Sequence, residues 1–209
     1  MIDVDMSNTF RPLILLNGPP RSGKDEGAKL LYTKYNAHWF RMSQPLKDTV
    51  RAMFNMTSLQ QQACEDKKDT RMEFLFDRTY REVQIAVSEE FMKPYFGSNV
   101  LGHLAARRVA NSASRMFVCS DSGFLSEAFP FIQLFGPASV LVVRLHRRGC
   151  NFDNDSRSYI SVPGATNIDL ENHYSLAAYQ DNLLEVVKAW LRTLDQSTEV
   201  SFNAHRPLA

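Results

Sequence analysis

The stretch GPPRSGKD, residues 18–25, constrains the fold more than any other part of the chain. It matches the phosphate-binding pattern G-x-x-x-x-G-K-[ST] except at its last position, where a carboxylate replaces a hydroxyl. The glycines allow the backbone to fold around an anion, so that amide N–H groups and the start of a following helix face a phosphate. Lys24 then reaches the β- and γ-phosphates of a nucleotide. The pattern predicts a loop that binds a nucleoside triphosphate.

The residues on either side of this loop fit the structural context that the pattern requires. Residues 11–17, RPLILLN, form a short apolar run, which predicts a buried strand of a parallel sheet. Residues 25–35 place Ala28, Leu31 and Tyr35 at helical spacing, which predicts a helix directly after the loop. We therefore predict that the nucleotide contacts Gly18, Arg21, Ser22, Gly23, Lys24, Asp25 and Glu26.

The rest of the chain alternates between apolar runs and helical patterns. Further strands are predicted over residues 37–42, 115–120, 140–145 and 167–170. Helices are predicted from Ser43 onward and after Ser175, which caps the last helix. This alternation indicates a three-layer α/β fold with a parallel sheet, in which ligands bind outside the carboxyl ends of the strands.

Two long segments interrupt the alternation. Residues 57–114 are polar and helical and show no convincing strand, so we interpret them as a helical insertion on the acceptor side of the sheet. Residues 146–166 contain HRRGCNFDNDSRSY, which we interpret as a lid loop. At 209 residues the chain suits one well-buried domain, with its core at about 11–56 and 115–195.

Composition argues against several classes of protein. The 24 Lys and Arg residues oppose 23 Asp and Glu residues, so a net charge of +1 gives no overall attraction to nucleic acid or to acidic membranes. The three cysteines, Cys64, Cys119 and Cys150, form no C-x-x-C pair, which fits a reducing cytoplasm. The first ten residues lack the basic and apolar regions of a signal peptide, and no apolar run suits a bilayer. We expect a cytoplasmic protein without a membrane partner.

Two carboxylates are candidates for holding a metal ion. Asp25 takes the place of the Mg²⁺-binding hydroxyl, and hard cations favour carboxylate oxygens, although Asp25 could serve only as a helix cap. Asp121 ends the third strand in FVCSDSG, where proteins with such a loop keep an acid for Mg²⁺ or for proton transfer. An Asp that begins a Ser-Gly turn is also common without function. We predict both residues as metal ligands and Asp121 as catalytic.

Arginines gather on and after the strand predicted at residues 140–145. They are Arg144, Arg147, Arg148 and Arg157. Phosphoryl transfer spreads negative charge over the γ-phosphate oxygens, and lid arginines neutralise that charge while they exclude water. A solvated basic loop is the alternative. We predict Arg157, which Asp155 would orient, and Arg148 as catalytic residues beside Lys24.

The GKD sequence, followed after a predicted strand by Ser-Gln-Pro-Leu-Lys47, resembles the deoxynucleoside monophosphate kinases of tailed bacteriophages. The resemblance covers mainly the first third of the chain. In that family the loop reads G-x-x-x-S-G-K-D-T and the later segment F-A-x-P-L-K, so Glu26 and Met42-Ser43-Gln44 depart from the family. A related group of phage kinases, which phosphorylate 5-hydroxymethyluracil in DNA during thymine hypermodification, is similar as well. The loop alone does not separate the two groups.

The resemblance implies a P-loop NTPase fold and a kinase that uses ATP and Mg²⁺ to phosphorylate a deoxynucleotide. It also implies that Arg81 in TYREVQ faces the acceptor. Arg78 and Lys47 are further candidates for binding the acceptor's phosphate, whereas helical arginines that only pair with acids are the alternative. Phe91, Tyr95 and Phe96 could stack a base, although such a cluster is more often core.

Three hypotheses about the acceptor follow. If the chain is a monophosphate kinase, we expect a closed acceptor pocket with a dedicated Arg, and the acceptor needs no strong base. If the chain is a kinase that acts on DNA, we expect an open groove lined with Lys and Arg. In that case Asp121 is more important, because the acceptor hydroxyl needs a base. A switch that binds ATP and transfers nothing is the third. The sequence leaves open whether the chain forms a homodimer, and whether it is phage-encoded and thus resident in a host cytoplasm.

Overall fold

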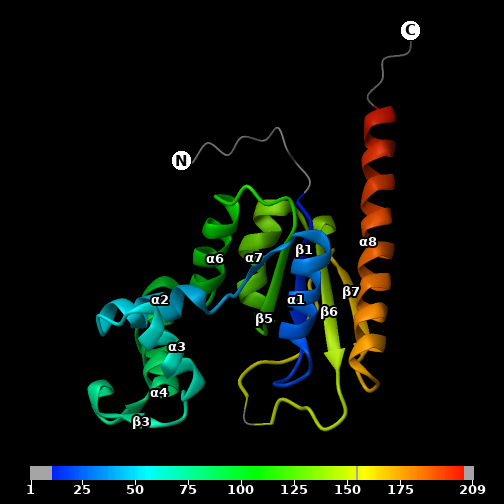
Figure 1. The fold of residues 1–209 in the computed structure, drawn as a ribbon. Helices are drawn as coiled ribbons and strands as arrows, with labels where there is room; N and C mark the ends of the chain where they lie inside the picture. The colour runs from blue at the N-terminus through cyan, green and yellow to red at the C-terminus, as the bar shows by residue number, and fades with distance from the viewer. Residues whose placement is uncertain (1–10, 154, 205–209) are drawn as a thin grey trace.

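The computed structural model describes residues 11–153 and 155–204, and these form an α/β fold around a parallel sheet (Figure 1). The sheet contains β1 (Leu13–Asn17), β2 (His38–Phe40), β5 (Phe117–Ser122), β6 (Val140–His146) and β7 (Thr166–Glu171). Their spatial order is β2-β5-β1-β6-β7, and all neighbours pair in parallel. From β1 the chain runs to the edge strand β2 and back to β5 on one side, and then to β6 and β7 on the other, and ligands of such sheets bind at the carboxyl ends where the strand order reverses. The predicted fold class is confirmed.

Helices cover both faces of the sheet. Ile14 and Leu16 of β1 face α1 (Lys24–Tyr35) and α8 (Leu176–Ala204), whereas Leu13 and Leu15 face α6 (Val100–Ala110) and α7 (Leu125–Phe135). Alternate residues of a strand point to opposite faces, so a strand of five consecutive buried residues supplies both apolar layers. The three layers follow directly from the apolar run RPLILLN.

One helix was not expected. Sequence analysis assigns no element between Phe124 and Val140, yet α7 and the short turn η3 (Pro137–Ser139) fill this interval. A parallel crossover from β5 to β6 requires a connection of this length. The segment LSEAFPFIQLF is rich in aromatic residues and contains Pro130 inside the helix, and such residues are weak helix formers. Packing on the sheet therefore decides the conformation of this segment.

The acceptor-side insertion has an apolar core of its own. It follows α2 (Gln44–Met53) and contains α3 (Ser58–Asp66), α4 (Tyr80–Ile85), the π-helix η2 (Ala86–Met92) and α5 (Lys93–Phe96). Leu46, Val50, Leu75, Tyr80 and Val83 are buried there in one cluster. The expectation that this region lacks strands is wrong, because β3 (Arg71–Met72) and β4 (Arg78–Thr79) pair around the turn η1 (Glu73–Leu75). The insertion lies at the carboxyl-end level of the sheet (Figure 1).

Helix α6 belongs to the sheet core, although it falls within residues 57–114. Ala105, Ala106 and Val109 pack in the same cluster as Leu13 and Leu15 of β1. Val100 and Leu101, at the start of the same helix, pack instead in the cluster of the insertion, so α6 connects the two cores. No helix of the described ranges combines the length and apolar character that a membrane crossing needs. The first ten residues, on which the absence of a signal peptide was argued, lie outside those ranges.

Candidate active site

The loop GPPRSGKD connects β1 with the first turn of α1, as predicted. Gly23 has a φ of 105°, a backbone conformation that favours glycine. A Cβ at Gly18 would lie 2.9 Å from the carbonyl oxygen of Leu145, so the loop passes close against β6. No side chain caps the N-terminus of α1, and its first amides therefore remain available to an anion. The predicted order of strand, glycine loop and helix is present, and the binding of phosphate by this loop remains a prediction.

Lys24 folds back over this loop. Its Nζ donates hydrogen bonds to the carbonyl oxygens of Gly18 (2.7 Å) and Pro19 (2.6 Å). Burial lowers the pKa of Lys24 to about 8, because a charged ammonium loses solvation there. Arg157 lowers that pKa further by repulsion. An anion bound in the loop would stabilise the charged form that the protein alone disfavours.

Three carboxylates surround the ammonium group of Lys24. Asp25, Asp155 and Asp121 each act to raise its pKa, in that order of strength. These interactions show that the fold gathers residues from α1, from β5 and from the loop after β6. The structure thus brings together four predicted site residues, Lys24, Asp25, Asp121 and Arg157.

Asp25 is exposed at the start of α1. Its Oδ1 accepts a hydrogen bond from Arg41 at 3.1 Å. An exposed carboxylate next to the phosphate loop fits a Mg²⁺ ion that takes its other ligands from phosphates and water. No group of three or more potential His, Cys, Asp or Glu ligands occurs in the described part of the chain. The role of Asp25 as a metal ligand remains a prediction that its position supports.

Asp121 holds the start of α2. Its Oδ1 accepts hydrogen bonds from the Met42 amide (2.7 Å) and the Cys119 thiol (3.2 Å). Its Oδ2 accepts from the Ser43 amide (3.1 Å) and the Ser43 hydroxyl (2.7 Å). A carboxylate offers about four acceptor positions, so a metal or a substrate proton would have to displace one of these donors. The predicted metal and catalytic roles of Asp121 require that exchange and remain predictions.

Arg157 lies directly above the residue that follows β5. A Cβ at Gly123 would come within 2.5 Å of the Cγ and Cδ atoms of Arg157. Asp155 accepts hydrogen bonds from Nε (2.9 Å) and from the backbone amide (3.0 Å) of Arg157. This pairing lowers the pKa of Asp155 to about 2 and raises that of Arg157. As expected from the sequence, Asp155 orients Arg157.

The second half of the predicted lid loop is attached to the sheet. Asn17 Nδ2 donates to the carbonyl oxygens of Ser122 (2.9 Å) and Ser158 (3.0 Å). Asn17 Oδ1 accepts from the Ile160 amide at 3.0 Å, and Ile160 and Val162 are buried in the core. Ile160 and Val162 thus attach the second half of this segment to the core, and the interpretation of residues 146–166 as a lid loop remains a prediction.

The other three arginines near β6 differ in their surroundings. Arg144 donates to both carboxylate oxygens of Asp169 on β7, and Arg147 Nη1 donates to the carbonyl oxygen of Arg21 in the loop (3.0 Å). The backbone amide of Arg148 donates a hydrogen bond to His173 Nδ1 (3.0 Å). Its side chain makes no hydrogen bond or ion pair among the residues described. The catalytic role of Arg148 remains a prediction.

The predicted acceptor residues lie in different places. Arg81 pairs with Asp69 at 2.6 Å, which raises its pKa, and it also interacts electrostatically with Arg157 and Asp155. Arg81 is therefore near enough to Arg157 and Asp155 to interact with them electrostatically. Lys47 forms an ion pair with Glu65 (2.9 Å) between α2 and α3. The Arg78 side chain has no hydrogen bond or ion pair within the described ranges.

Sequence analysis missed Glu127, in the first turn of α7. This residue is only 4% exposed, and burial raises the pKa of its carboxyl to about 7, with a smaller contribution from Asp121. Lys93 and Arg157 act in the opposite direction. The signal lay in the acid of LSEAF, because a helix that starts just after a strand's carboxyl end points its first turn toward the site. That signal required recognising α7.

The aromatic cluster of the insertion is not core. Phe91, Tyr95 and Phe96 are more than half exposed, with ring centroids 5.4 Å apart for Phe91–Tyr95 and 6.0 Å for Phe91–Phe96. Lys93, in the same segment, lies over the ring of Phe124 at 4.9 Å. The segment therefore borders the start of α7 and presents aromatic rings to solvent.

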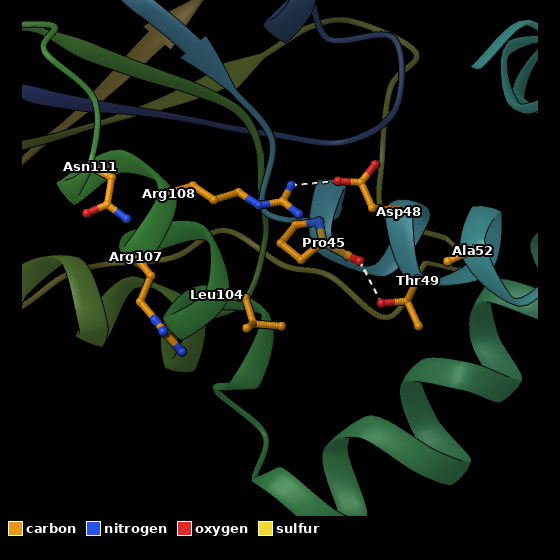
Figure 2. A pocket seen from close by; sticks show the side chains of 8 residues that line it. All are labelled: Pro45, Asp48, Thr49, Ala52, Leu104, Arg107, Arg108 and Asn111. Carbon is orange, nitrogen blue, oxygen red and sulfur yellow. Dashed lines mark hydrogen bonds and ion pairs between the residues drawn. The ribbon is translucent and has the colours of Figure 1, made fainter. Parts of the chain in front are cut away.

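A groove runs between α2 and α6, beside the insertion. Figure 2 shows its lining, and its volume is about 510 Å³. Arg108 pairs with Asp48 across it at 2.8 Å. Arg107 makes no side-chain hydrogen bond or ion pair in the described part of the chain. A second cavity of about 390 Å³ shares Arg108 and continues to Trp39 and Arg41 at the edge strand β2. Since Arg41 pairs with Asp25, this second cavity extends toward the phosphate loop.

Comparisons with known proteins found similar structures only. No protein-family model and no curated protein matches the chain. A sugar kinase from Janibacter sp. HTCC2649 is 13% identical, with a TM-score of 0.45 over 87% of this chain and 95% of that one. The protein TT1252 from Thermus thermophilus is 14% identical, with a TM-score of 0.47 over 86% and 97%. Likenesses at this level carry no activity over to this chain.

Proposed function

We propose that the chain is an ATP-dependent phosphotransferase whose donor site is the loop GPPRSGKD. The observation that supports this most is the environment of Lys24. Its ammonium is bound to the carbonyl oxygens of Gly18 and Pro19, and burial and Arg157 lower its pKa to about 8. A bound polyphosphate would favour the charged form of this partly buried lysine beyond what the nearby carboxylates do. The uncapped start of α1 adds amide donors for the same anion.

Each residue of the donor site has a part in this proposal. The loop amides and Lys24 hold the β- and γ-phosphates, and Arg157 stabilises the charge that develops on the transferred group. Asp155 holds the guanidinium of Arg157, whose aliphatic carbons lie over Gly123. A Mg²⁺ ion, when bound, would neutralise charge on the β- and γ-phosphates, and Asp25 is the best-placed residue to hold it. Arg148 would add a second cation from the same loop.

As acceptor we propose a deoxynucleoside monophosphate. Arg81 supports this choice, because it projects from the insertion and interacts with Arg157 and Asp155 of the donor side. A guanidinium there suits the acceptor's phosphate, which must approach the γ-phosphate of ATP. Arg78 and Lys47 would assist from β4 and α2. The acceptor oxygen already carries negative charge, so this reaction needs no strong base.

The first experiment measures ADP production from Mg-ATP with each of six acceptors. They are the four deoxynucleoside monophosphates, 5-hydroxymethyl-dUMP, and DNA that contains 5-hydroxymethyluracil. We expect turnover with a monophosphate, and a loss of about 100-fold or more in Lys24→Ala. The matched control is Lys29→Ala, an exposed lysine of the same helix, which should keep full activity. Wild-type protein that binds ATP but phosphorylates none of the six would contradict the proposal.

A second candidate acceptor is 5-hydroxymethyluracil in DNA. The groove between α2 and α6 favours it, because Arg107 there is unpaired among the described residues and the neighbouring cavity continues toward Asp25 through Arg41. An arginine-lined groove suits a phosphate backbone longer than one nucleotide. In this reaction a hydroxyl would lose its proton to a base, for which Asp121 is the candidate.

The second candidate is tested by the salt dependence of DNA binding. If the groove holds the DNA backbone, Arg107→Ala lowers affinity and reduces the slope of log K against log salt by about one. Arg192→Ala on α8 is the control and should change neither quantity. Equal binding by both variants, or turnover with free monophosphates only, would remove DNA as the acceptor.

A further inference from the structure

Two buried side chains, to which the proposed function gives no part, hold the loop GPPRSGKD on the side of β7 and α8. Asn172, which follows β7, donates a hydrogen bond from Nδ2 to the carbonyl oxygen of Ser22 (2.8 Å). Tyr179, in the first turn of α8, donates from its hydroxyl to the carbonyl oxygen of Gly23 (3.0 Å). The two residues are only 8% and 2% exposed. They therefore fix two consecutive peptide units of the loop from within the protein interior.

Two glycines leave room for these side chains. A Cβ at Gly23 would lie 2.6 Å from Asn172 Nδ2, and a Cβ at Gly27 would lie 2.4 Å from the Tyr179 hydroxyl. Both distances are too short for atoms that are not bonded, so any other residue at either position would displace a donor. Gly27 lies inside α1, where glycine is a poor helix former. The chain thus has glycine at both positions where these two contacts need it.

Asn172 is itself held by the sheet. Its backbone amide donates to the carbonyl oxygen of His146 (2.7 Å), just beyond the last residues that pair β6 with β7. From the same end of β6, Arg147 donates to the carbonyl oxygen of Arg21 (3.0 Å). The carbonyl groups of residues 21–23 thus all accept hydrogen bonds from the side of β6, β7 and α8. The sheet therefore supports the loop at three consecutive residues.

A fixed carbonyl group also fixes the direction of the amide in the same peptide unit. No cis peptide bond occurs in the described ranges, and in a trans peptide the C=O and N–H bonds point in opposite directions. The Ser22 carbonyl shares its peptide unit with the Gly23 amide, and the Gly23 carbonyl shares its unit with the Lys24 amide. Neither amide donates a hydrogen bond within the described part of the chain. The two contacts therefore direct two free N–H donors away from β7 and α8.

We propose that Asn172 and Tyr179 are positioning residues that direct the amides of Gly23 and Lys24 toward a bound polyphosphate. The inference rests on the proposed binding of ATP in this loop, and it names the residues that prepare the loop for that anion. A loop whose donors are already directed loses little conformational freedom on binding, so it binds the anion more tightly. Both residues act through the loop backbone, as supporting contacts of a binding site do.

The test measures the binding of inorganic tripolyphosphate and of ATP by calorimetric titration, without an acceptor. Asn172→Ala removes the donor to the Ser22 carbonyl, and we expect it to bind each anion about 10-fold more weakly than the wild type. Asn182→Ala, at an exposed position of α8, is the matched control and should bind both anions as the wild type does.

A second variant tests the other contact while it keeps the packing. Tyr179→Phe retains the buried ring and removes only the hydroxyl. The Gly27 amide still donates to the Gly23 carbonyl in this variant (2.9 Å), so we expect a smaller loss of affinity, about 3-fold. Tyr32→Phe, at an exposed position of α1, is its control and should show no loss.

The amide signals of the loop separate this role from a purely structural one. In isotope-labelled wild-type protein, tripolyphosphate should shift the NMR signals of the Gly23 and Lys24 amides, and in Asn172→Ala the shift at Gly23 should be smaller. Wild-type signals that do not respond would overturn the inference. A lower melting temperature of Asn172→Ala with unchanged affinity for both anions would overturn it as well. Anion binding that depends on Asn172, in a protein that phosphorylates no acceptor, would instead contradict the proposed function alone.

Discussion

Lys24 and Glu127 carry opposite charges, and burial shifts the pKa of both toward neutral pH. The ammonium of Lys24 has a pKa of about 8, and the carboxyl of Glu127 has one of about 7. In both cases desolvation is the largest cause. Such groups concentrate at sites where a ligand completes the environment. Each gives a prediction that depends on pH.

At pH values above the pKa of Lys24, the protein should take up protons when it binds a nucleotide. At about pH 8.5 most of the free protein has an uncharged Lys24, whereas the complex holds it charged next to the phosphates. Calorimetric titration with ATP in buffers of different ionisation enthalpy should therefore detect uptake of most of one proton at that pH and much less at about pH 6.5. Lys29→Ala should behave as the wild type. Equal proton exchange at both pH values would contradict the lowered pKa.

Stability should fall between about pH 4.5 and 7 because of Glu127. The folded pKa is raised from 4.5 to about 7, so in this window the folded protein keeps a proton that the unfolded chain has released. The free energy of unfolding then decreases as pH rises, by about 3 kcal/mol in total at 1.36 kcal/mol per unit. Urea unfolding of Glu127→Gln should lack this contribution. A variant whose pH profile parallels that of the wild type would show that the carboxyl titrates normally.

At the scale of elements, Asn17 connects three segments at the end of β1. Its side chain bonds the carbonyl oxygens of Ser122 and Ser158 and the amide of Ile160. Asn17→Ala leaves these groups without partners, which costs about 1–3 kcal/mol for each one that stays buried. We expect faster hydrogen exchange at the Ile160 amide and a lower turnover number, because Arg157 precedes this segment directly. Unchanged exchange at Ile160 would show that the core holds the segment without Asn17.

The elements differ in how far the sequence predicts them, for physical reasons. β1, the loop and α1 depend on local signals, namely an apolar run, glycines and helical spacing, and the structure has them where expected. β5 extends to Ser122 because its last residues pair with β1, a contact that no local pattern encodes. α7 escaped prediction because its aromatic residues and Pro130 become helical by packing on the sheet. Glu127 was not singled out either, because it lies in α7.

The candidate site shows the same division. Lys24, Asp25 and Asp121 could be predicted because each lies at or shortly after the carboxyl end of a strand along the chain. The place of Arg157 over Gly123 depends on Asn17 and Ile160, which are far from each other in sequence. The contacts of Arg81 with the donor side likewise depend on how the insertion folds back. Contacts between residues that are far apart in the sequence therefore could not be predicted from local patterns.

At the scale of the whole molecule, the three cysteines lie in different parts of the fold. Burial raises the pKa of Cys64 in the insertion and of Cys119 in the sheet, whereas Cys150 lies partly exposed after β6. A thiol-reactive dye should modify Cys150 alone in the folded protein, since buried thiols with a raised pKa react slowly. The other two should react only after denaturation. Rapid native labelling of Cys64, tested in Cys150→Ser, would indicate that the insertion opens.

The attachment of residues 158–162 to β1 has a consequence for the order of events during turnover. Arg157 already lies over Gly123, and the loop is already formed around Lys24, so no part of the donor half waits for the acceptor. ATP should then have the same Michaelis constant at every acceptor concentration, and the two substrates should bind in random order. In such a scheme the acceptor does not change the affinity for ATP, and at saturating ATP the rate depends on the acceptor concentration alone.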